Sequence, residues 1–328
     1  MFEATQLLFY YAVSPVHMGA GSAIGAIDSP IQREVHTQHP MFAGSGIKGA
    51  LRHHFSRAWP REGDGGNKPS SLINRIFGPD TGASDFAGAL SLTDAQLVAL
   101  PVRALKGGFA YVTSPLALAR LQRLALQARL TADWAVPAAA DNKALVASAN
   151  LLGHRPGSPA SAAADQLVLE AFEFTAQPNP ALAAIAQWLA GHALPGASNQ
   201  FFADKLKTDL VLLSDTDFAH FARHAMVVEP HVRINDESGT ADDGGLFYVE
   251  NLPPETLMVG LAQASVERFK KDSRRSDSPE LLSASRVLAQ VLAGEGDQLP
   301  GIRGKLLQIG GDATTGRGLV LVQAVAAS

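Results

Sequence analysis

The chain has 328 residues, of which 46% are hydrophobic and 18% are charged, a balance typical of a globular protein and not of a disordered one. It contains no cysteine, which excludes disulfides, thiolate metal sites, iron–sulfur clusters and a cysteine nucleophile. The 27 Lys and Arg against 31 Asp and Glu give a formal net charge of −4. Binding of nucleic acid would therefore need a local basic patch.

The first residues predict a buried strand and no export signal. No basic segment precedes an apolar stretch at the N-terminus, and the apolar run Leu7–Val13 is far shorter than the roughly 20 residues that cross a bilayer. We therefore expect a cytoplasmic protein without a membrane segment. The aromatic and aliphatic residues of Leu7–Val13 favour a strand, and a glycine-rich loop follows at His17–Pro30.

The glycines of this loop allow a rival function. Gly19, Gly21 and Gly25 follow a predicted strand, as in a dinucleotide fingerprint. However, their spacing is GxGxxxG, and Asp28-Ser29-Pro30 stands where that fingerprint needs a helix. A nicotinamide-dependent oxidoreductase is kept as a rival hypothesis, and a structural glycine-rich turn is preferred.

The next segment predicts an amphipathic helix. Apolar residues recur at helical spacing, at Ile47, Leu51, Phe55 and Ala58. Ser45 is the expected N-cap, and Lys48 and Arg52, four residues apart, share a face. Because a helix N-terminus offers free N–H groups to an anion, this start is compatible with a phosphodiester site. A solvated basic helix face explains the same pattern.

The middle of the chain predicts alternating elements. Arg61–Ser71 is polar and is expected to form a surface loop. Short strands are expected at Ala89–Leu92 and Phe109–Val112, and a helix at Pro115–Leu130. The segment from about 147 to 195 begins with an Ala/Gly/Ser/Pro-rich stretch and is expected to be an insertion or loop region.

A long hairpin and a final helix are predicted next. His231–Ile234 and Leu246–Glu250 read as two extended arms within Glu229–Pro253. Four carboxylates lie at the tip between them: Asp236, Glu237, Asp242 and Asp243. Pro279–Leu292 has the spacing of a helix.

The last glycine-rich loop, Gly310–Gly318, lies between two predicted strands. A Walker-type loop would lead into a helix that begins with Lys-Ser/Thr, whereas this one returns to a strand and carries Arg317. Glycine amides could approach a phosphate and the guanidinium could bind it. A flexible hairpin turn explains the pattern equally well.

The histidines do not predict a zinc site. Five of the ten lie between His17 and His54, without two imidazoles on one helix turn. His220 and His224 have HxxxH spacing, but no glutamate follows the first and no third ligand is evident. The interleaved strands and helices indicate an α+β fold, and a ferredoxin-like βαββαβ core with insertions fits the pattern.

Many of these motifs belong together. The relevant blocks are His17–Gly21, Gly25–Glu34, His36-Thr37, Gly44–Arg52, Phe77–Pro79, Asp85–Leu90, Asp94-Ala95, Pro101–Gly107, Phe109–Pro115 and Gly310–Gly318. Together they closely resemble the RAMP (repeat-associated mysterious protein) superfamily, and within it the backbone subunit of type III-B CRISPR (Cmr) effector complexes. Arg61–Ser71 and Ala147–Pro195 carry no resemblance that we can name.

The resemblance implies a single domain over residues 1–328 with an RRM-like core, large insertions and a β-hairpin thumb at about 229–253. Several copies would stack along a CRISPR RNA as a helical filament, with the other type III-B subunits. Each thumb would displace one nucleotide of the duplex of guide and target, and the subunit would cut the single-stranded target RNA there. Such a ribonucleoprotein would act in antiviral defence.

The resemblance also implies catalytic residues. Asp28, in the Asp-x-Pro-Ile-Gln-Arg-Glu motif, matches the family's catalytic aspartate, and His17 matches its histidine; Tyr248 and Glu250 would lie near the cut. An ionised Asp28 would take the proton of the RNA 2′-OH or hold a divalent metal, Mg or Mn. The product would then carry a 2′,3′-cyclic phosphate. No organic cofactor is expected.

The RNA-binding residues follow from the same motifs. The expected set is Arg33, Ser45, Gly46, Lys48, Arg52, Gly310, Gly311, Thr315, Gly316 and Arg317. The sequence departs from the family at three places. Ser29 replaces a larger apolar residue, Gly46 replaces a common serine, and Gln38-His39 replaces the usual pair of a glycine and an aromatic residue. The acidic tip is expected to face away from RNA or to meet a neighbouring subunit. The alternative is a non-catalytic structural RNA-binding subunit of a CRISPR complex.

Overall fold

The computed structural model describes residues 2–22, 25–59, 71–79, 86–155, 157, 159, 164–268 and 280–325. Of the predicted surface loop Arg61–Ser71 only Ser71 is among these residues, and Pro279, the expected start of the last helix, lies outside them. Within the described part of the chain, no helix has the length and apolar character needed to span a membrane.

Strands and helices alternate along the chain. The strands are β1 (Ala4–Ala12), β2 (Met41–Phe42), β3 (Leu90–Leu92), β4 (Ala95–Ala104), β5 (Gly108–Thr113), β6 (Lys143–Val146), β7 (Gln166–Leu169), β8 (Phe172–Pro178), β9 (Leu210–Leu212), β10 (Val227–Ile234), β11 (Ala241–Asn251), β12 (Leu257–Ala264), β13 (Gly294–Glu295), β14 (Leu299–Pro300), β15 (Lys305–Gln308) and β16 (Leu319–Val325). The helices are α1 (Gly44–Ala58), α2 (Leu72–Phe77), α3 (Pro115–Gln127), α4 (Pro180–Ala193), α5 (Gln200–Asp209), α6 (Asp215–His224) and α7 (Ala284–Leu292), with 3-10 turns η1 (Ala149–Leu151), η2 (Ala197–Asn199) and η3 (Ala313–Thr315). The mixed α+β class is therefore confirmed.

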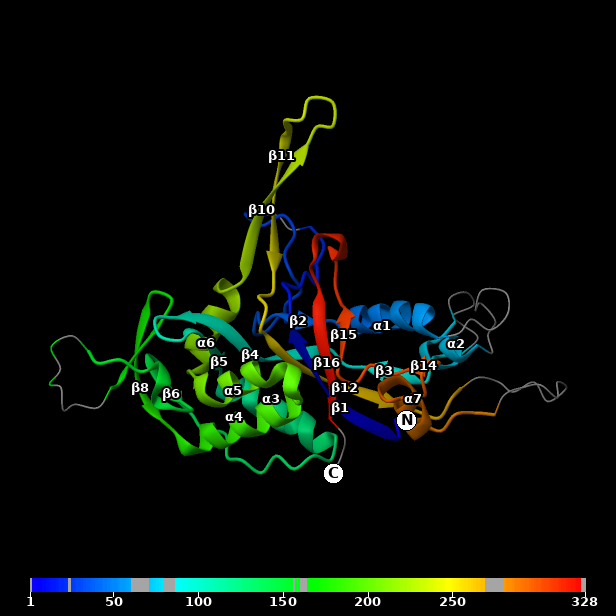
Figure 1. The fold of residues 1–328 in the computed structure, drawn as a ribbon, viewed down its shortest axis with the longest axis horizontal. Helices are drawn as coiled ribbons and strands as arrows, with labels where there is room; N and C mark the ends of the chain where they lie inside the picture. The colour runs from blue at the N-terminus through cyan, green and yellow to red at the C-terminus, as the bar shows by residue number, and fades with distance from the viewer. Residues whose placement is uncertain are drawn as a thin grey trace.

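One twelve-stranded sheet organises the body of the molecule. Its order is β15-β16-β1-β12-β4-β5-β9-β6-β8-β7, with β2 paired to β4 and β3 to β12 (Figure 1). Strand β7 also pairs with β4 through Leu169 and Ala104, which closes the six strands from β4 to β7 into a ring.

The sheet buries apolar side chains on both faces, which explains the continuous apolar run near the N-terminus. Along β1, Leu8 and Tyr10 point into the core that also contains residues of α1, α6 and α7. Leu7 and Phe9 point into a second core with residues of α3, α4 and α5. A strand covered on both faces needs no polar alternation, because its side chains alternate between two apolar layers.

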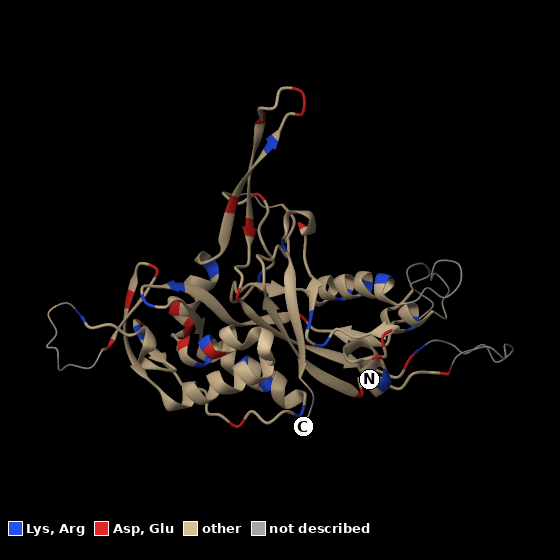
Figure 2. Ribbon diagram, in the orientation of Figure 1, with Lys and Arg blue, Asp and Glu red and all other residues tan. Residues whose placement is uncertain are grey.

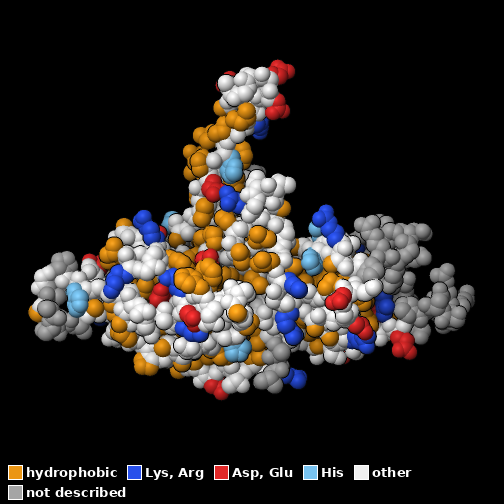
Figure 3. Space-filling model, in the orientation of Figure 1, with side chains coloured by type: hydrophobic (Ala, Val, Ile, Leu, Met, Phe, Trp, Pro, Cys, Tyr) orange, Lys and Arg blue, Asp and Glu red, His pale blue; other side chains and the backbone are white. Residues whose placement is uncertain are grey.

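The hairpin β10–β11 leaves this body and projects away from it (Figure 1). Its arms are longer than the predicted ones, with Val227 paired to Asn251 at the base and Val232 to Leu246 higher up. Val228, Val232 and Leu246 stay exposed, and apolar side chains line the stalk in Figure 3. The acidic residues of the tip colour the ribbon red at the far end of the hairpin in Figure 2.

Two expectations differ from the structure. The segment 147–195 is not a loop throughout, because it contains β7, β8 and α4, whose Leu182 and Leu189 are fully buried. Helix α1 begins at Gly44 with Ala43, not Ser45, as N-cap. Ala43 has no side-chain acceptor for the helix start, and Asp94 supplies one: its Oδ1 accepts a hydrogen bond from the Gly44 amide at 2.7 Å.

Candidate functional site

The Asp28 loop is attached to the base of the hairpin. The amides of Asp28 and Ser29 both donate to the Tyr248 carbonyl at 3.1 Å, and Asp28 Oδ2 accepts the Tyr248 amide at 2.7 Å. Asp28 is nevertheless exposed. The carboxylate is thus fixed by the backbone of β11 and remains accessible to a ligand from solvent.

His17 contacts the same strand, β11, two residues further along, at Glu250. Its Nδ1 lies 2.8 Å from the Glu250 carbonyl oxygen, which can only accept a hydrogen bond, so Nδ1 carries a proton. In the neutral ring Nε2 then presents a lone pair. Because Tyr248 and Glu250 are two residues apart on one strand, their attachment points lie about 7 Å apart. The strand therefore brings Asp28 and His17 together.

Glu250 and Arg33 form a buried ion pair beneath this loop. Glu250 Oε2 also accepts the amide of Ile31 at 3.0 Å, and Arg33 Nη1 donates to the carbonyls of Gln38 at 2.8 Å and Ala222 at 2.7 Å. Glu250 is only 3% exposed. This arrangement favours a positioning role for both side chains, whereas Tyr248, at 38% exposure, presents its ring to solvent.

A cavity of about 780 Å³ lies beside His17, between α1 and the loop of residues 310–318. Glycines form much of its wall: Gly19, Gly46, Gly49, Gly310 and Gly311. Gly310 has φ +92°, and a Cβ there would lie 2.6 Å from the His17 carbonyl oxygen, so no larger residue fits. Backbone without side chains lets an extended ligand approach closely.

The basic groups in this cavity come from the second half of α1. His53, His54 and Arg57 line it, and burial lowers the pKa of His54, which favours its neutral form. Gly46, Gly49, His53 and Arg57 recur at three- and four-residue intervals, which is the spacing of one helix face. This spacing was available in the sequence, where His53 and His54 were considered only as metal ligands.

Lys48 and Arg52 point to a neighbouring face of α1 and do not line the cavity. Lys48 Nζ donates to the Leu90 carbonyl at 2.9 Å, and burial, with the charge of Arg52, lowers its pKa. Arg52 donates to Asn74 Oδ1 at 2.6 Å and to the Gly78 carbonyl. Arg52 thus connects α1 to α2. The Lys48 ammonium has three N–H donors and uses one of them on the Leu90 carbonyl.

The loop of residues 310–318 is anchored to the first loop and to the hairpin. The amide of Gly311 donates to the His17 carbonyl at 2.8 Å. Thr315 Oγ1 donates to the Asp312 carbonyl at 2.8 Å, and Gly316 has φ +81°. Arg317 pairs with Glu229 of β10. Of the predicted RNA-binding residues, Gly46, Gly310 and Gly311 therefore meet at one cavity, whereas the others do not line it.

The donors around Asp28 do not make a complete metal site. Among the residues that the structure describes, no three His, Asp or Glu side chains come together as ligands. Mg²⁺ often binds through one or two carboxylates together with substrate phosphates and water. These residues fit an ion held in that way and do not fit one held by protein alone.

The rival dinucleotide site also lacks its context. Gly19 forms an isolated bridge with Ile31, and Ser29 forms one with Val249 of β11. The described residues between Gly25 and Pro30 therefore run along the hairpin base and do not begin a helix. The amides that would cradle a pyrophosphate at a helix start are absent from this part of the described chain.

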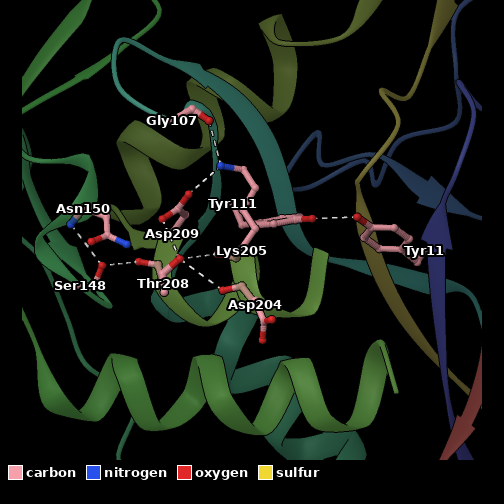
Figure 4. Close-up of polar contacts among 9 residues, drawn as sticks. All are labelled: Tyr11, Gly107, Tyr111, Ser148, Asn150, Asp204, Lys205, Thr208 and Asp209. Carbon is pink, nitrogen blue, oxygen red and sulfur yellow. Dashed lines mark hydrogen bonds and ion pairs between the residues drawn. The ribbon is translucent and has the colours of Figure 1, made fainter. Parts of the chain in front are cut away.

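A second polar cluster lies around α5 (Figure 4). Lys205 Nζ donates to Asp209 Oδ2 at 2.6 Å and to the Gly107 carbonyl at 2.9 Å, and it lies 4.4 Å from the centre of the Phe109 ring. The hydroxyls of Tyr11 and Tyr111 are 2.8 Å apart, and burial raises the pKa of both far above the ordinary value. Because these groups satisfy one another, the cluster is structural.

Three comparisons with known proteins agree. A sequence model of the RAMP superfamily matches residues 9–321. The chain is 31% identical over 320 residues to the CRISPR system Cmr endoribonuclease Cmr4 of Pyrococcus furiosus, which spans 96% of this chain and 94% of that protein. A crystal structure of oligomeric Cmr4 from Pyrococcus furiosus superposes with a TM-score of 0.65 at 25% identity, over 98% of this chain and 97% of that one. A cryo-EM structure of the type III-B Cmr-beta complex bound to cognate target RNA contains a chain of the same fold, with a TM-score of 0.66 at 17% identity over 98% of each chain.

Proposed function

Because the chain belongs to the RAMP superfamily, we propose that it is the backbone subunit of a type III-B CRISPR effector, which binds CRISPR RNA and cuts complementary target RNA. Its similarity to a Cmr endoribonuclease extends over almost its whole length, and a crystal structure of that relative is oligomeric. Its partners are then other copies of itself, the other effector subunits, guide RNA and target RNA, in a cytoplasmic complex.

The fold of the core supports an RRM-like arrangement. The strands β16, β1, β12 and β4 are neighbours in that order and pair antiparallel. In chain order they are β1, β4, β12 and β16, with α1 after the first and α7 before the last. This order supports the βαββαβ connectivity that we propose for a ferredoxin-like core. The hairpin β10–β11 is inserted before β12 and is the proposed thumb.

The cavity between α1 and residues 310–318 is the proposed guide site. Its glycine walls let phosphates reach backbone amides, and His53 and Arg57 supply donors within it. Arg57 carries a permanent charge that suits a phosphate, and the Lys48 ammonium adds charge nearby. The net charge of −4 is compatible with this role because the positive charge is local.

Asp28 is the proposed base for cleavage. Its carboxylate takes the proton of the ribose 2′-OH, the 2′-oxygen forms a bond to the adjacent phosphorus, and the bond to the 5′-oxygen breaks. The leaving 5′-oxygen takes a proton from water, or from Nε2 of His17 when the ring carries protons on both nitrogens, and the products end in a 2′,3′-cyclic phosphate and a 5′-OH. Alternatively, Asp28 would hold a divalent cation, Mg²⁺ or Mn²⁺, which would supply charge stabilisation for the reaction.

The observation that carries the nuclease proposal is the exposed Asp28 carboxylate, fixed on β11 beside His17. It favours cleavage over the alternative of a purely structural RNA-binding subunit, because a structural subunit needs no fixed, accessible carboxylate there. Glu250 and Arg33 hold the loop from below, and the Tyr248 amide holds the Asp28 carboxylate.

The test uses the assembled complex with Asp28→Asn, and Asp236→Asn at the hairpin tip as the matched control. We expect the Asp28 variant to bind target RNA normally and to cut it on the order of 10²- to 10⁴-fold more slowly, while the control cuts normally. A target with one 2′-deoxy sugar at a cut position should resist cutting there only. Unchanged cutting by Asp28→Asn would refute the assignment and favour the structural alternative or another base.

A further inference from the structure

Two carboxylates at the hairpin base each hold an arginine from a different loop. Glu250 of β11 pairs with Arg33 of the Asp28 loop, and Glu229 of β10 pairs with Arg317 of the glycine-rich loop. In the strand register Glu229 faces Val249, while Glu250 faces Val228. Since neighbouring residues alternate between the faces of a strand pair, the two ion pairs lie on opposite faces of the hairpin.

The two pairs differ in how firmly they are held. In the first pair the side chains are 16% and 4% exposed, and the Arg33 guanidinium also donates to carbonyls of the chain. In the second pair the side chains of Arg317 and Glu229 are 21% and 29% exposed, and the structure gives the Arg317 guanidinium no other ion-pair partner among the described residues. A more solvated pair with fewer supporting bonds exchanges more readily.

Glu229 also has other partners on its own hairpin. Its Oε2 accepts from Asn251 Nδ2 at 3.4 Å and lies 4.0 Å from His231 Nε2. If Arg317 is released, the Glu229 carboxylate therefore keeps its contacts with Asn251 and His231. Arg317, for its part, has the planar fork of donors that binds a carboxylate or a phosphate in the same geometry.

We propose that Glu229 occupies the phosphate subsite of Arg317 and is displaced from it by an RNA phosphate. Glu229 thereby sets the affinity of this subsite, and its displacement releases the hairpin from the glycine-rich loop when RNA binds. This inference rests on the proposed function, because the displacing group is a phosphate of RNA bound beside residues 310–318.

The test measures binding of a fluorescein-labelled single-stranded RNA to the full chain by anisotropy. Glu229→Gln removes the competing charge and keeps the shape, so we expect RNA to bind about two- to fivefold more tightly, the range that corresponds to a partly exposed ion pair. In an Arg317→Gln background the same change should give no gain. Glu237→Gln, at the acidic tip, is the control and should not tighten binding. Thermal melting confirms that each variant is folded.

The outcomes separate the two proposals. If Glu229→Gln fails to tighten binding, or tightens it equally with and without Arg317, Glu229 does not compete at Arg317 and the inference is wrong, while RNA binding itself stands. If the wild-type chain and the assembled complex both fail to bind RNA, the proposed function is wrong and the inference with it.

Discussion

Two polar networks on the two sides of the sheet differ in how completely they are satisfied. Around α5, Lys205, Asp209 and the Gly107 carbonyl satisfy one another, and the two ion-pair side chains are 11% and 9% exposed. At the hairpin base, Asp28 is exposed, His17 presents one ring nitrogen to a cavity, and Glu229 is more exposed than either partner of the α5 pair.

This difference separates polar groups that stabilise the fold from those that are available to a ligand. Both networks contain ion pairs, carbonyl acceptors and a neighbouring cavity, so the presence of charge alone does not distinguish them. A satisfied buried network has no donor left for a ligand, whereas exposed groups fixed by backbone contacts are ready to bind one. Variants in the two networks should therefore affect different properties.

The largest effect on stability is expected in the α5 network. Lys205→Met leaves the buried Asp209 carboxylate without its counter-charge, which should cost about 3–5 kcal/mol of unfolding free energy. Lys207→Met, two residues along the same helix, removes a more exposed partner of Asp204 and should cost much less. Urea unfolding measures both. RNA affinity of the folded Lys205→Met chain should be unchanged; a loss of affinity without a loss of stability would place a ligand site at α5.

An intermediate effect is expected in the proposed guide site. Arg57→Gln removes one charge from the cavity and should lower RNA affinity, and the slope of log K against log salt should fall in magnitude by about 0.7, as expected for one contact with a single strand. Lys48→Glu should also weaken binding. If Lys48→Glu leaves affinity and slope unchanged while Arg57→Gln lowers both, the site lies in the cavity and the helix-start assignment of Lys48 is wrong.

The smallest effect concerns pH. Burial raises the pKa of Glu255, whose carboxylate accepts the Tyr11 hydroxyl, above its ordinary value of 4.5. Between 4.5 and the raised value the folded chain holds this proton and the unfolded chain has lost it, so stability falls as pH rises through this window. Glu255→Gln should flatten that part of the profile of unfolding free energy against pH. An unchanged profile would show that Glu255 does not cause the dependence, and RNA binding should not respond to the change.

The sequence predicted those elements whose signals are local. The spacing of Ile47, Leu51 and Phe55 predicted α1, and the apolar run after Gln6 predicted β1, because helix and strand periods are visible in a single segment. Strand β4 was not predicted as a strand, because it contains Pro101, and a proline usually argues against a strand. Part of it was noted only within the block Pro101–Gly107 of the family resemblance. The segment 147–195 was expected to be an insertion or loop region because its first part has a composition typical of loops, whereas β7, β8 and α4 all lie after that part.

Partners distant in the chain could not be predicted in the same way. The contact of Asp28 with Tyr248 spans 220 residues, and the ion pair of Arg317 with Glu229 spans 88. The motif resemblance placed Asp28 and Tyr248 near one cut site. No motif or spacing in the sequence, however, indicates that Glu229 pairs with Arg317. Likewise, Lys48 and Arg52 share a helix face in the sequence, while the direction of that face depends on α2 and β3.

The most direct test of the account is to crosslink 4-thiouridine-containing guide RNA to the assembled complex and to identify the modified peptides by mass spectrometry. We expect crosslinks within residues 44–58 and 306–321, beside the cavity, and none within residues 197–212, which contain α5. Crosslinks concentrated at α5, with residues 44–58 and 306–321 unmodified, would contradict it.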